Sequence, residues 1–146
     1  GKVYAFDLQQ TAIDSASSRL EQSGLSHRVE WFCTGHEYML KYIAPEYHGE
    51  ITAVIFNLGY LPGGDKAIQT QTATTLAALQ QAYAMLKPSG VLSVIAYPGH
   101  NGGERELEAV KGWFDRLESN PYQLTIPDSQ WNNAPQWFWL IKSVTD

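Results

Sequence analysis

The stretch ITAVIFNLGYLPGGDK, residues 51–66, changes character near its middle. Its first six residues are apolar or β-branched and are typical of a strand buried on both faces. The next ten contain an Asn, three Gly, a Pro, an Asp and a Lys. Glycine lets a backbone adopt positive φ or approach a bound molecule closely. The stretch therefore predicts a central strand that ends in a binding loop.

Strand and helix patterns alternate on both sides of this stretch. Strands are predicted at 2–7, 27–33, 51–58 and 91–97. Helices are predicted at about 9–23, 34–43, 67–87 and 104–118, with the KPSG sequence at 87–90 ending the third. Segments 122–128 and 137–143 have no helix between them and predict a closing antiparallel pair. This order is typical of an α/β fold with a mostly parallel sheet and helices on both faces.

Composition narrows the range of functions. The 146 residues suit a single domain, 1–146, and 44% of them are hydrophobic, as in globular proteins. The net charge of −5 counts against a large nucleic-acid surface. One cysteine, Cys33, excludes an internal disulfide framework and favours a cytoplasmic location. The sequence also lacks an apolar run of membrane-span length, histidines at metal-ligand spacing, a GxSxG elbow and a P-loop.

The polar residues gather where the predicted parallel strands end. Right-handed crossovers bring those ends to one edge of the sheet, and ligands bind outside that edge. Asp7 closes the first strand, and its carboxylate can accept hydrogen bonds from both hydroxyls of a ribose or can cap the next helix. Both interpretations stay open. For His36 a structural role is favoured over ligand stacking or general-base catalysis, and Thr34 can cap the short helix that follows.

Two glycine-rich loops carry the stronger signals. In the first, the amide of Asn57 can both donate and accept, so it suits an amine or an adenine edge. A plain turn with Asp65 as helix cap is the alternative, but a cap needs one such residue and not the entire loop. In the second, YPGHNGGERE, the neighbouring glycines leave His100 little chance of burial, so it is a better candidate than His36. The NNAP sequence at 132–135 is either a hairpin loop or a cover over the substrate.

Taken together, GKVYAFDLQ, NLGYLPGGDK, IQTQTATTLAAL, LKPSGVLSVIAYPGHNGGERE and the NNAP and WLIKS segments resemble a known family. The chain is similar to the class I methyltransferases that use S-adenosylmethionine (SAM). More closely, it resembles the bacterial rRNA methylase-like family, whose members are tRNA 5-aminomethyl-2-thiouridine methyltransferases. The resemblance implies a Rossmann-like sheet, SAM as cofactor and a tRNA wobble uridine as substrate. It also suggests a homodimer, with no metal and no membrane.

The resemblance implies roles for individual residues. Cofactor binding would fall to Asp7, Gln9, Thr34, Gly35, His36, Asn57, Leu58 and Gly59. The substrate would contact Tyr60, Gly64, Lys66, Tyr97 and Asn133. Catalysis, by in-line transfer to a neutral amine, would involve Asn57, Asp65 and His100.

The chain departs from the family at one place. Members of the family begin with a strand and a Gly-rich turn upstream of the part that GKVYAFD matches. We therefore expect a fragment of a longer protein, in which the missing strand lies between 2–7 and 51–58. The alternative is that the remaining strands have re-paired. Either way, we expect these 146 residues alone to bind the cofactor weakly or not at all.

Two other functions remain open. The negative charge would suit a methyltransferase that acts on a small amine better than one that acts on tRNA. The chain could also be a non-catalytic binding or oligomerisation protein. Its interface would then be Trp131, Trp137 and Trp139, although aromatic residues in a closing hairpin are more often core.

Overall fold

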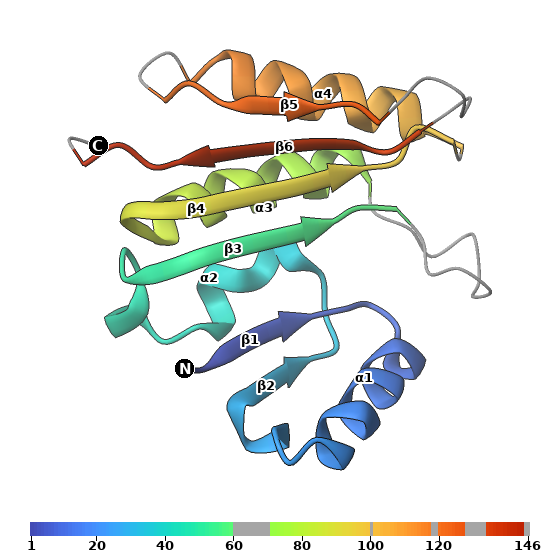
Figure 1. Ribbon diagram of the computed structural model, residues 1–146, viewed down its shortest axis with the longest axis vertical. Helices are drawn as coiled ribbons and strands as arrows, with labels where there is room; N and C mark the ends of the chain where they lie inside the picture. The colour runs from blue at the N-terminus through green and yellow to red at the C-terminus, as the bar shows by residue number, and fades with distance from the viewer. Residues whose placement is uncertain (60–70, 100, 118–119, 128–133, 145–146) are drawn as a thin grey trace.

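The computed structural model describes residues 1–59, 71–99, 101–117, 120–127 and 134–144 (Figure 1). Its strands are β1 (Val3–Phe6), β2 (Val29–Phe32), β3 (Ile51–Asn57), β4 (Leu86–Ala96), β5 (Gln123–Thr125) and β6 (Gln136–Ile141). Its α-helices are α1 (Gln10–Gln22), α2 (Met39–Tyr42), α3 (Thr72–Met85) and α4 (Gly103–Asp115). Short 3-10 helices are η1 (Ser26–Arg28), η2 (His36–Tyr38) and η3 (Pro45–Tyr47).

The strands form two sheets. β1 pairs with β2 in parallel, and the second sheet has the order β3-β4-β6-β5. In that second sheet β3 and β4 are parallel, whereas β6 runs antiparallel to both β4 and β5. The predicted alternation and the closing antiparallel pair are confirmed. The carboxyl ends of β1, β2, β3 and β4 all lie at the same edge (Figure 1).

β1 and β3 are neighbours that do not pair. Within the described residues, β1 is hydrogen-bonded only to β2, and β3 only to β4. The two strands point the same way, with a gap between them (Figure 1). The alternative that these two strands have re-paired with each other is therefore wrong.

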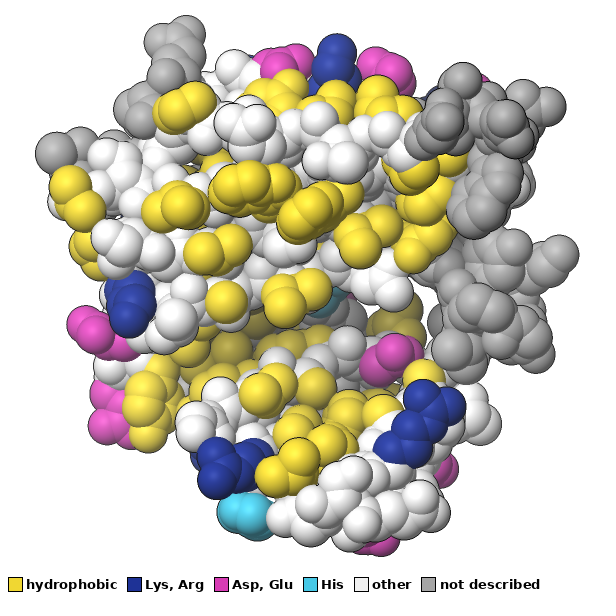
Figure 2. Space-filling view, in the orientation of Figure 1, with side chains coloured by type: hydrophobic (Ala, Val, Ile, Leu, Met, Phe, Trp, Pro, Cys, Tyr) yellow, Lys and Arg dark blue, Asp and Glu magenta, His cyan; other side chains and the backbone are white. Residues whose placement is uncertain are grey.

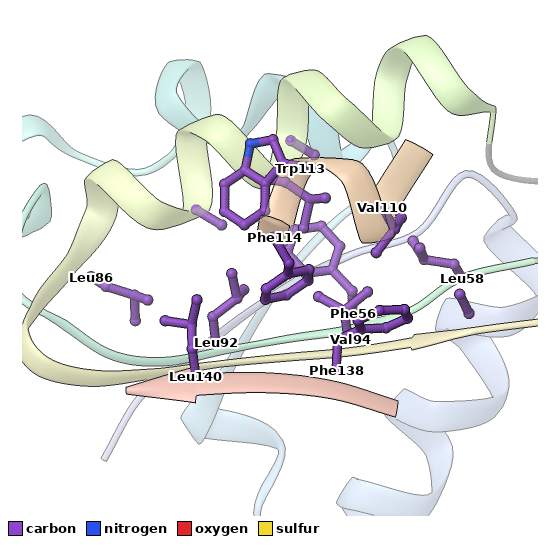
Figure 3. Packing of buried hydrophobic residues seen from close by; sticks show 14 of the residues in the cluster. Phe56, Leu58, Leu86, Leu92, Val94, Val110, Trp113, Phe114, Phe138 and Leu140 are labelled. Carbon is purple, nitrogen blue, oxygen red and sulfur yellow. The ribbon is translucent and has the colours of Figure 1, made fainter. Parts of the chain in front are cut away.

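The core lies on one face of the four-stranded sheet, under α3 and α4. Figure 3 shows side chains from β3, β4 and β6 meeting those of α4, with Leu92, Val94, Phe138, Leu140, Val110 and Phe114 among them. The ring of Phe114 stacks on that of Phe138, with centroids 5.3 Å apart. Every second residue of the strands and one face of each of α3 and α4 supply this cluster. This follows from the two-residue repeat of a strand and the 3.6-residue repeat of a helix. None of the helices among the described residues is long and apolar enough to cross a membrane.

No described helix covers the opposite face of this sheet. Ile55 is 75% exposed and Ala53 is also exposed, whereas Phe56, the residue after Ile55, is buried on the core side. The prediction that β3 is buried on both faces is therefore wrong for the described structure, because no described helix packs on that side. Figure 2 shows apolar side chains spread over this face and a hollow between the two sheets.

The end of α3 also differs from its prediction. The helix stops at Met85, and β4 begins at the next residue, so the KPSG sequence lies inside the bounds of β4. The reason is long-range pairing: the Ser89 amide donates to the Lys142 carbonyl (3.0 Å), and the Lys142 amide donates to Gly90 (2.8 Å). Helix α4 ends at Asp115 and not at about 118.

Candidate functional site

The strand exits are held in register by main-chain bonds that extend past the strands. The Asp7 amide donates to the Phe32 carbonyl (3.1 Å), one residue beyond the end of β1. The Leu58 amide likewise donates to Ile95 (2.9 Å), one residue beyond β3. Both polar exits therefore begin from backbone that is already fixed by a neighbouring strand.

Asp7 makes a local turn before α1. Its Oδ1 accepts a hydrogen bond from the Gln9 amide (2.8 Å), and the side chain is exposed. The N-cap of α1 is Gln9, with no capping side-chain bond, so the cap interpretation of Asp7 is wrong in its strict form. A carboxylate has about four lone-pair sites, so the turn leaves acceptor capacity for ribose hydroxyls.

The segment after β2 is partly buried. The Gly35 backbone is buried, and the His36 ring lies edge-on to Phe56, with centroids 5.4 Å apart. Burial lowers the pKa of His36 below its ordinary value, and the nearby Glu37 charge opposes that shift only in part. The imidazole is therefore neutral near pH 7. Thr34 does not cap η2, because the N-cap there is Gly35 and no side-chain capping bond forms.

Helix α3 holds this segment from behind. The Gln81 side chain accepts from the Leu40 amide (3.2 Å) and donates to the Glu37 carbonyl. These two bonds join the η2–α2 segment, which follows β2, to the helix that covers the other sheet. The position of His36 is thus tied to both sheets.

At the β3 exit, two adjacent side chains face opposite ways. Leu58 is buried in the core cluster and points toward α4 (Figure 3), whereas Asn57 is exposed. A cofactor can therefore reach Leu58 only through its main chain. Gly59 has φ of 129°, a backbone conformation that a side chain would strain. The exit thus combines an exposed amide with a glycine turn.

At the β4 exit, α4 approaches the preceding backbone closely. A Cβ added to Gly103 would lie 2.6 Å from the Tyr97 carbonyl oxygen and 2.8 Å from that of Pro98. Only glycine fits there, which explains one glycine of the NGG sequence. Tyr97 itself is exposed at the sheet edge.

One buried polar pair was missed by the sequence analysis. Thr75 Oγ1 donates to Glu106 Oε2 (2.9 Å), and both residues are buried. A signal existed, because 106, 110 and 113 have the spacing of one inward helix stripe.

The predicted site residues divide into two groups. Those that lie at the carboxyl ends of β1 to β4 are Asp7, Gln9, Thr34, Gly35, His36, Asn57, Leu58, Gly59 and Tyr97. Those that lie outside the described residues are Tyr60, Gly64, Asp65, Lys66, His100 and Asn133. Within the described part of the chain, no three His, Cys, Asp or Glu side chains are placed to hold a metal ion.

Comparisons with known proteins place the chain among methyltransferases. Residues 3–142 match the model of the family described as "Putative rRNA methylase". A chloroplastic tRNA (mnm(5)s(2)U34)-methyltransferase of Arabidopsis thaliana is 47% identical over 120 residues. That match covers 80% of this chain and 43% of the plant protein, so the chain spans less than half the length of this relative.

Two solved structures are also similar. A putative rRNA methylase from Clostridium thermocellum is 35% identical, with a TM-score of 0.87, and the match covers 97% of this chain and 75% of that one. A putative methyltransferase from Streptococcus mutans in complex with SAH is 33% identical, with a TM-score of 0.82 and coverages of 97% and 76%. The fold is that of the class I methyltransferases. Since the family model matches residues 3–142, which include every strand and helix of the described structure, the chain belongs to the rRNA methylase family.

Proposed function

We propose that the chain forms most of the catalytic domain of a SAM-dependent N-methyltransferase. Its substrate is the aminomethyl group of 5-aminomethyl-2-thiouridine at the wobble position of tRNA, and its product is the methylaminomethyl form. The observation that carries this proposal is the 47% identity, over 80% of the chain, to the Arabidopsis tRNA (mnm(5)s(2)U34)-methyltransferase. The SAH complex of the Streptococcus mutans relative supports SAM as the methyl donor.

The residues at the sheet edge fit this cofactor. The exposed carboxylate of Asp7 suits the two ribose hydroxyls. The buried backbone at Gly35 and the neutral ring of His36 suit an uncharged adenine. Thr34 precedes them in sequence, and Gln9 follows Asp7 by two residues. At the β3 exit, the positive φ of Gly59 lets the backbone turn close to a ligand. When bound, SAM supplies a methyl group on a positively charged sulfur.

The acceptor must be presented as a neutral amine, because an ammonium has no lone pair. The exposed amide oxygen of Asn57 can accept one amine N–H and so direct the lone pair toward the methyl group. Such alignment is the main contribution that a protein makes to direct transfer. Asp65 and His100 are the proposed groups for proton removal.

One of the remaining proposed substrate contacts, Tyr97, lies at the same sheet edge. Tyr97 is exposed there and can stack on a base. Tyr60, Gly64, Lys66 and Asn133 complete the proposed set. A homodimer and a cytoplasmic location remain predictions, and the plant relative is a chloroplastic protein.

A smaller amine is the second candidate substrate. The net charge of −5 favours it, because tRNA enzymes usually carry a positive surface. The two candidates differ in what accumulates when the gene is deleted.

The proposed enzyme has one more strand than the described residues form, and this strand lies between β1 and β3. β1 and β3 run parallel, and among the described residues nothing pairs with their facing edges. One further parallel strand between them would satisfy both. The apolar face beside the gap carries Ile55, Val91, Ile95, Trp137, Trp139 and Ile141. Helices cover both faces of most parallel α/β sheets, so a helix on this face would accompany that strand. The single domain 1–146 is accordingly proposed to be part of a larger one.

The deciding experiment is mass spectrometry of tRNA nucleosides from cells that lack the gene. Accumulation of 5-aminomethyl-2-thiouridine, reversed by a plasmid copy, is the expected result. A plasmid copy with Asn57→Ala should fail to reverse it. An unchanged nucleoside profile in the deletion strain would overturn the tRNA proposal, and a non-catalytic protein would give that same unchanged profile.

A further inference from the structure

A buried hydrogen bond joins the first turns of α3 and α4. Thr75 and Glu106 are each the fourth residue of their helix, and Thr75 Oγ1 donates to Glu106 Oε2 at 2.9 Å. Thr75 is 0% exposed and Glu106 is 2% exposed. Burying a carboxylate costs free energy unless the carboxylate is hydrogen-bonded. Loss of the bond from Thr75 would therefore destabilise the buried position of the Glu106 side chain.

Both helices begin directly after a segment that carries proposed site residues. The Thr75 amide bonds to the Gln71 carbonyl (2.9 Å), at the start of α3. The Glu106 amide bonds to the Gly102 carbonyl (3.0 Å), at the start of α4. The hydrogen bond between the two side chains therefore fixes the first turn of α3 relative to the first turn of α4.

The β4 exit is packed against one of these starts. Gly103 is so close to the Tyr97 and Pro98 carbonyls that no Cβ fits between them. A shift of the first turn of α4 must then move that backbone, since a dense contact transmits displacement. A contiguous path of contacts thus runs from Thr75 through Glu106 and Gly103 to Tyr97.

We propose that Thr75 and Glu106 are positioning residues for methyl transfer: their hydrogen bond holds the start of α4, and through Gly103 it holds Tyr97, against the acceptor. This inference rests on the proposed function, since Tyr97 is a proposed substrate contact. Neither side chain touches the reacting atoms. A misplacement of about 1 Å at a transfer site can lower the rate by about a hundredfold.

The test, in the full-length gene product, compares loss of the Thr75–Glu106 bond at the start of α3 with loss of the Lys142 bonds at its other end. Thr75→Val removes the hydroxyl at nearly constant volume, Thr75→Ser keeps it, and Glu106→Gln keeps an acceptor oxygen. Lys142→Met is the matched control, because the Lys142 ammonium bonds to the Tyr83 and Leu86 carbonyls at the other end of the helix. Each variant is measured for Tm, for SAH affinity by calorimetry, and for kcat and KM with tRNA that carries 5-aminomethyl-2-thiouridine.

For Thr75→Val we expect kcat/KM with tRNA to fall by roughly tenfold, with SAH affinity changed less than about twofold. Thr75→Ser should restore most of the loss. Lys142→Met should lower Tm comparably while kcat/KM stays near that of the wild type. Equal kinetic losses in Thr75→Val and Lys142→Met at equal Tm would show a merely structural role, and so would failure of Thr75→Ser to rescue.

Hydrogen exchange separates this inference from the proposed function. If the wild-type protein methylates no such tRNA, the proposed function fails, whereas the positioning of residues 97–99 and 101–103 can still be measured. Amides of these residues should then exchange faster in Thr75→Val than in Lys142→Met. Equal exchange rates in the two variants would overturn the inference by itself.

Discussion

The imidazole ring of His36 lies edge-on to the Phe56 ring, with their centroids 5.4 Å apart. His36 follows the two-stranded sheet, whereas Phe56 belongs to β3 of the four-stranded sheet. The contact therefore joins two sheets that, among the described residues, are not hydrogen-bonded to each other through any pair of strands. It also buries a titratable group, and this burial lowers the pKa of His36.

That burial predicts acid sensitivity. Between its folded pKa and about 6.5, His36 is protonated in the unfolded chain and neutral in the folded one. The unfolded state then binds more protons, so stability falls as the pH is lowered through this window. His36→Gln should flatten the dependence of Tm on pH there. His27→Gln, at an exposed position, is the control and should leave the slope as in the wild type.

Asp7 should matter for cofactor affinity and little for the fold. We expect Asp7→Asn to weaken SAH binding to the full-length protein by about tenfold or more, since hydrogen bonds to charged groups contribute about 1.5–3 kcal/mol. Asp14→Asn removes the same charge from the exposed surface of α1 and should bind SAH like the wild type. Calorimetric affinities for both variants check this. Equal affinities would remove Asp7 from the cofactor site.

Two glycines of α4 should respond in opposite ways to alanine. Gly103→Ala forces the Tyr97 and Pro98 backbone away and should destabilise the protein by about 1–3 kcal/mol while lowering methyl transfer. At Gly112 a Cβ would meet only the Arg116 side chain, at 3.4 Å. Gly112→Ala should therefore be neutral or stabilise by up to about 1 kcal/mol. Urea unfolding of both variants tests the contrast.

Lys142 should be a structural cation. Its ammonium is buried, donates to the Tyr83 and Leu86 carbonyls at 2.9 Å each, and lies 4.8 Å from the centre of the Tyr83 ring. Lys142→Met leaves these carbonyls without that donor, so we expect a loss of about 1–3 kcal/mol in urea unfolding. Lys111→Met, on the exposed side of α4, should change stability by no more than about 0.5 kcal/mol.

The uncovered sheet face offers a test of the proposed additional strand and helix. In the 146-residue chain, Ile55→Ser should raise solubility, because Ile55 is 75% exposed. In the full-length gene product the same change should lower Tm by several degrees, because the residue would be covered. Val144→Ser, at a residue that is 71% exposed beyond β6, is the control and should leave Tm unchanged in both. An unchanged Tm for full-length Ile55→Ser would argue against a covering helix.

Much of the site followed from local patterns. The order of strands and helices, the closing antiparallel pair and the polar strand exits were all predicted, and the described residues among those exits do lie at one sheet edge. Helix ends were predicted less well, because Leu86 and Lys87 continue a helical pattern locally but belong to β4. Pairing of Ser89 and Gly90 with Lys142 outweighs that preference.

The sequence by itself determined which segments become strands and helices and which residues stand at their ends, since periodicity and glycine placement act over a few neighbouring residues. Only the tertiary structure decided that β1 and β3 do not pair among the described residues, that no described helix covers one face of β3, and that Thr75 meets Glu106. The physical reason is that hydrogen-bond partners and burial depend on residues distant in the chain. Their proximity is set by how the entire core packs.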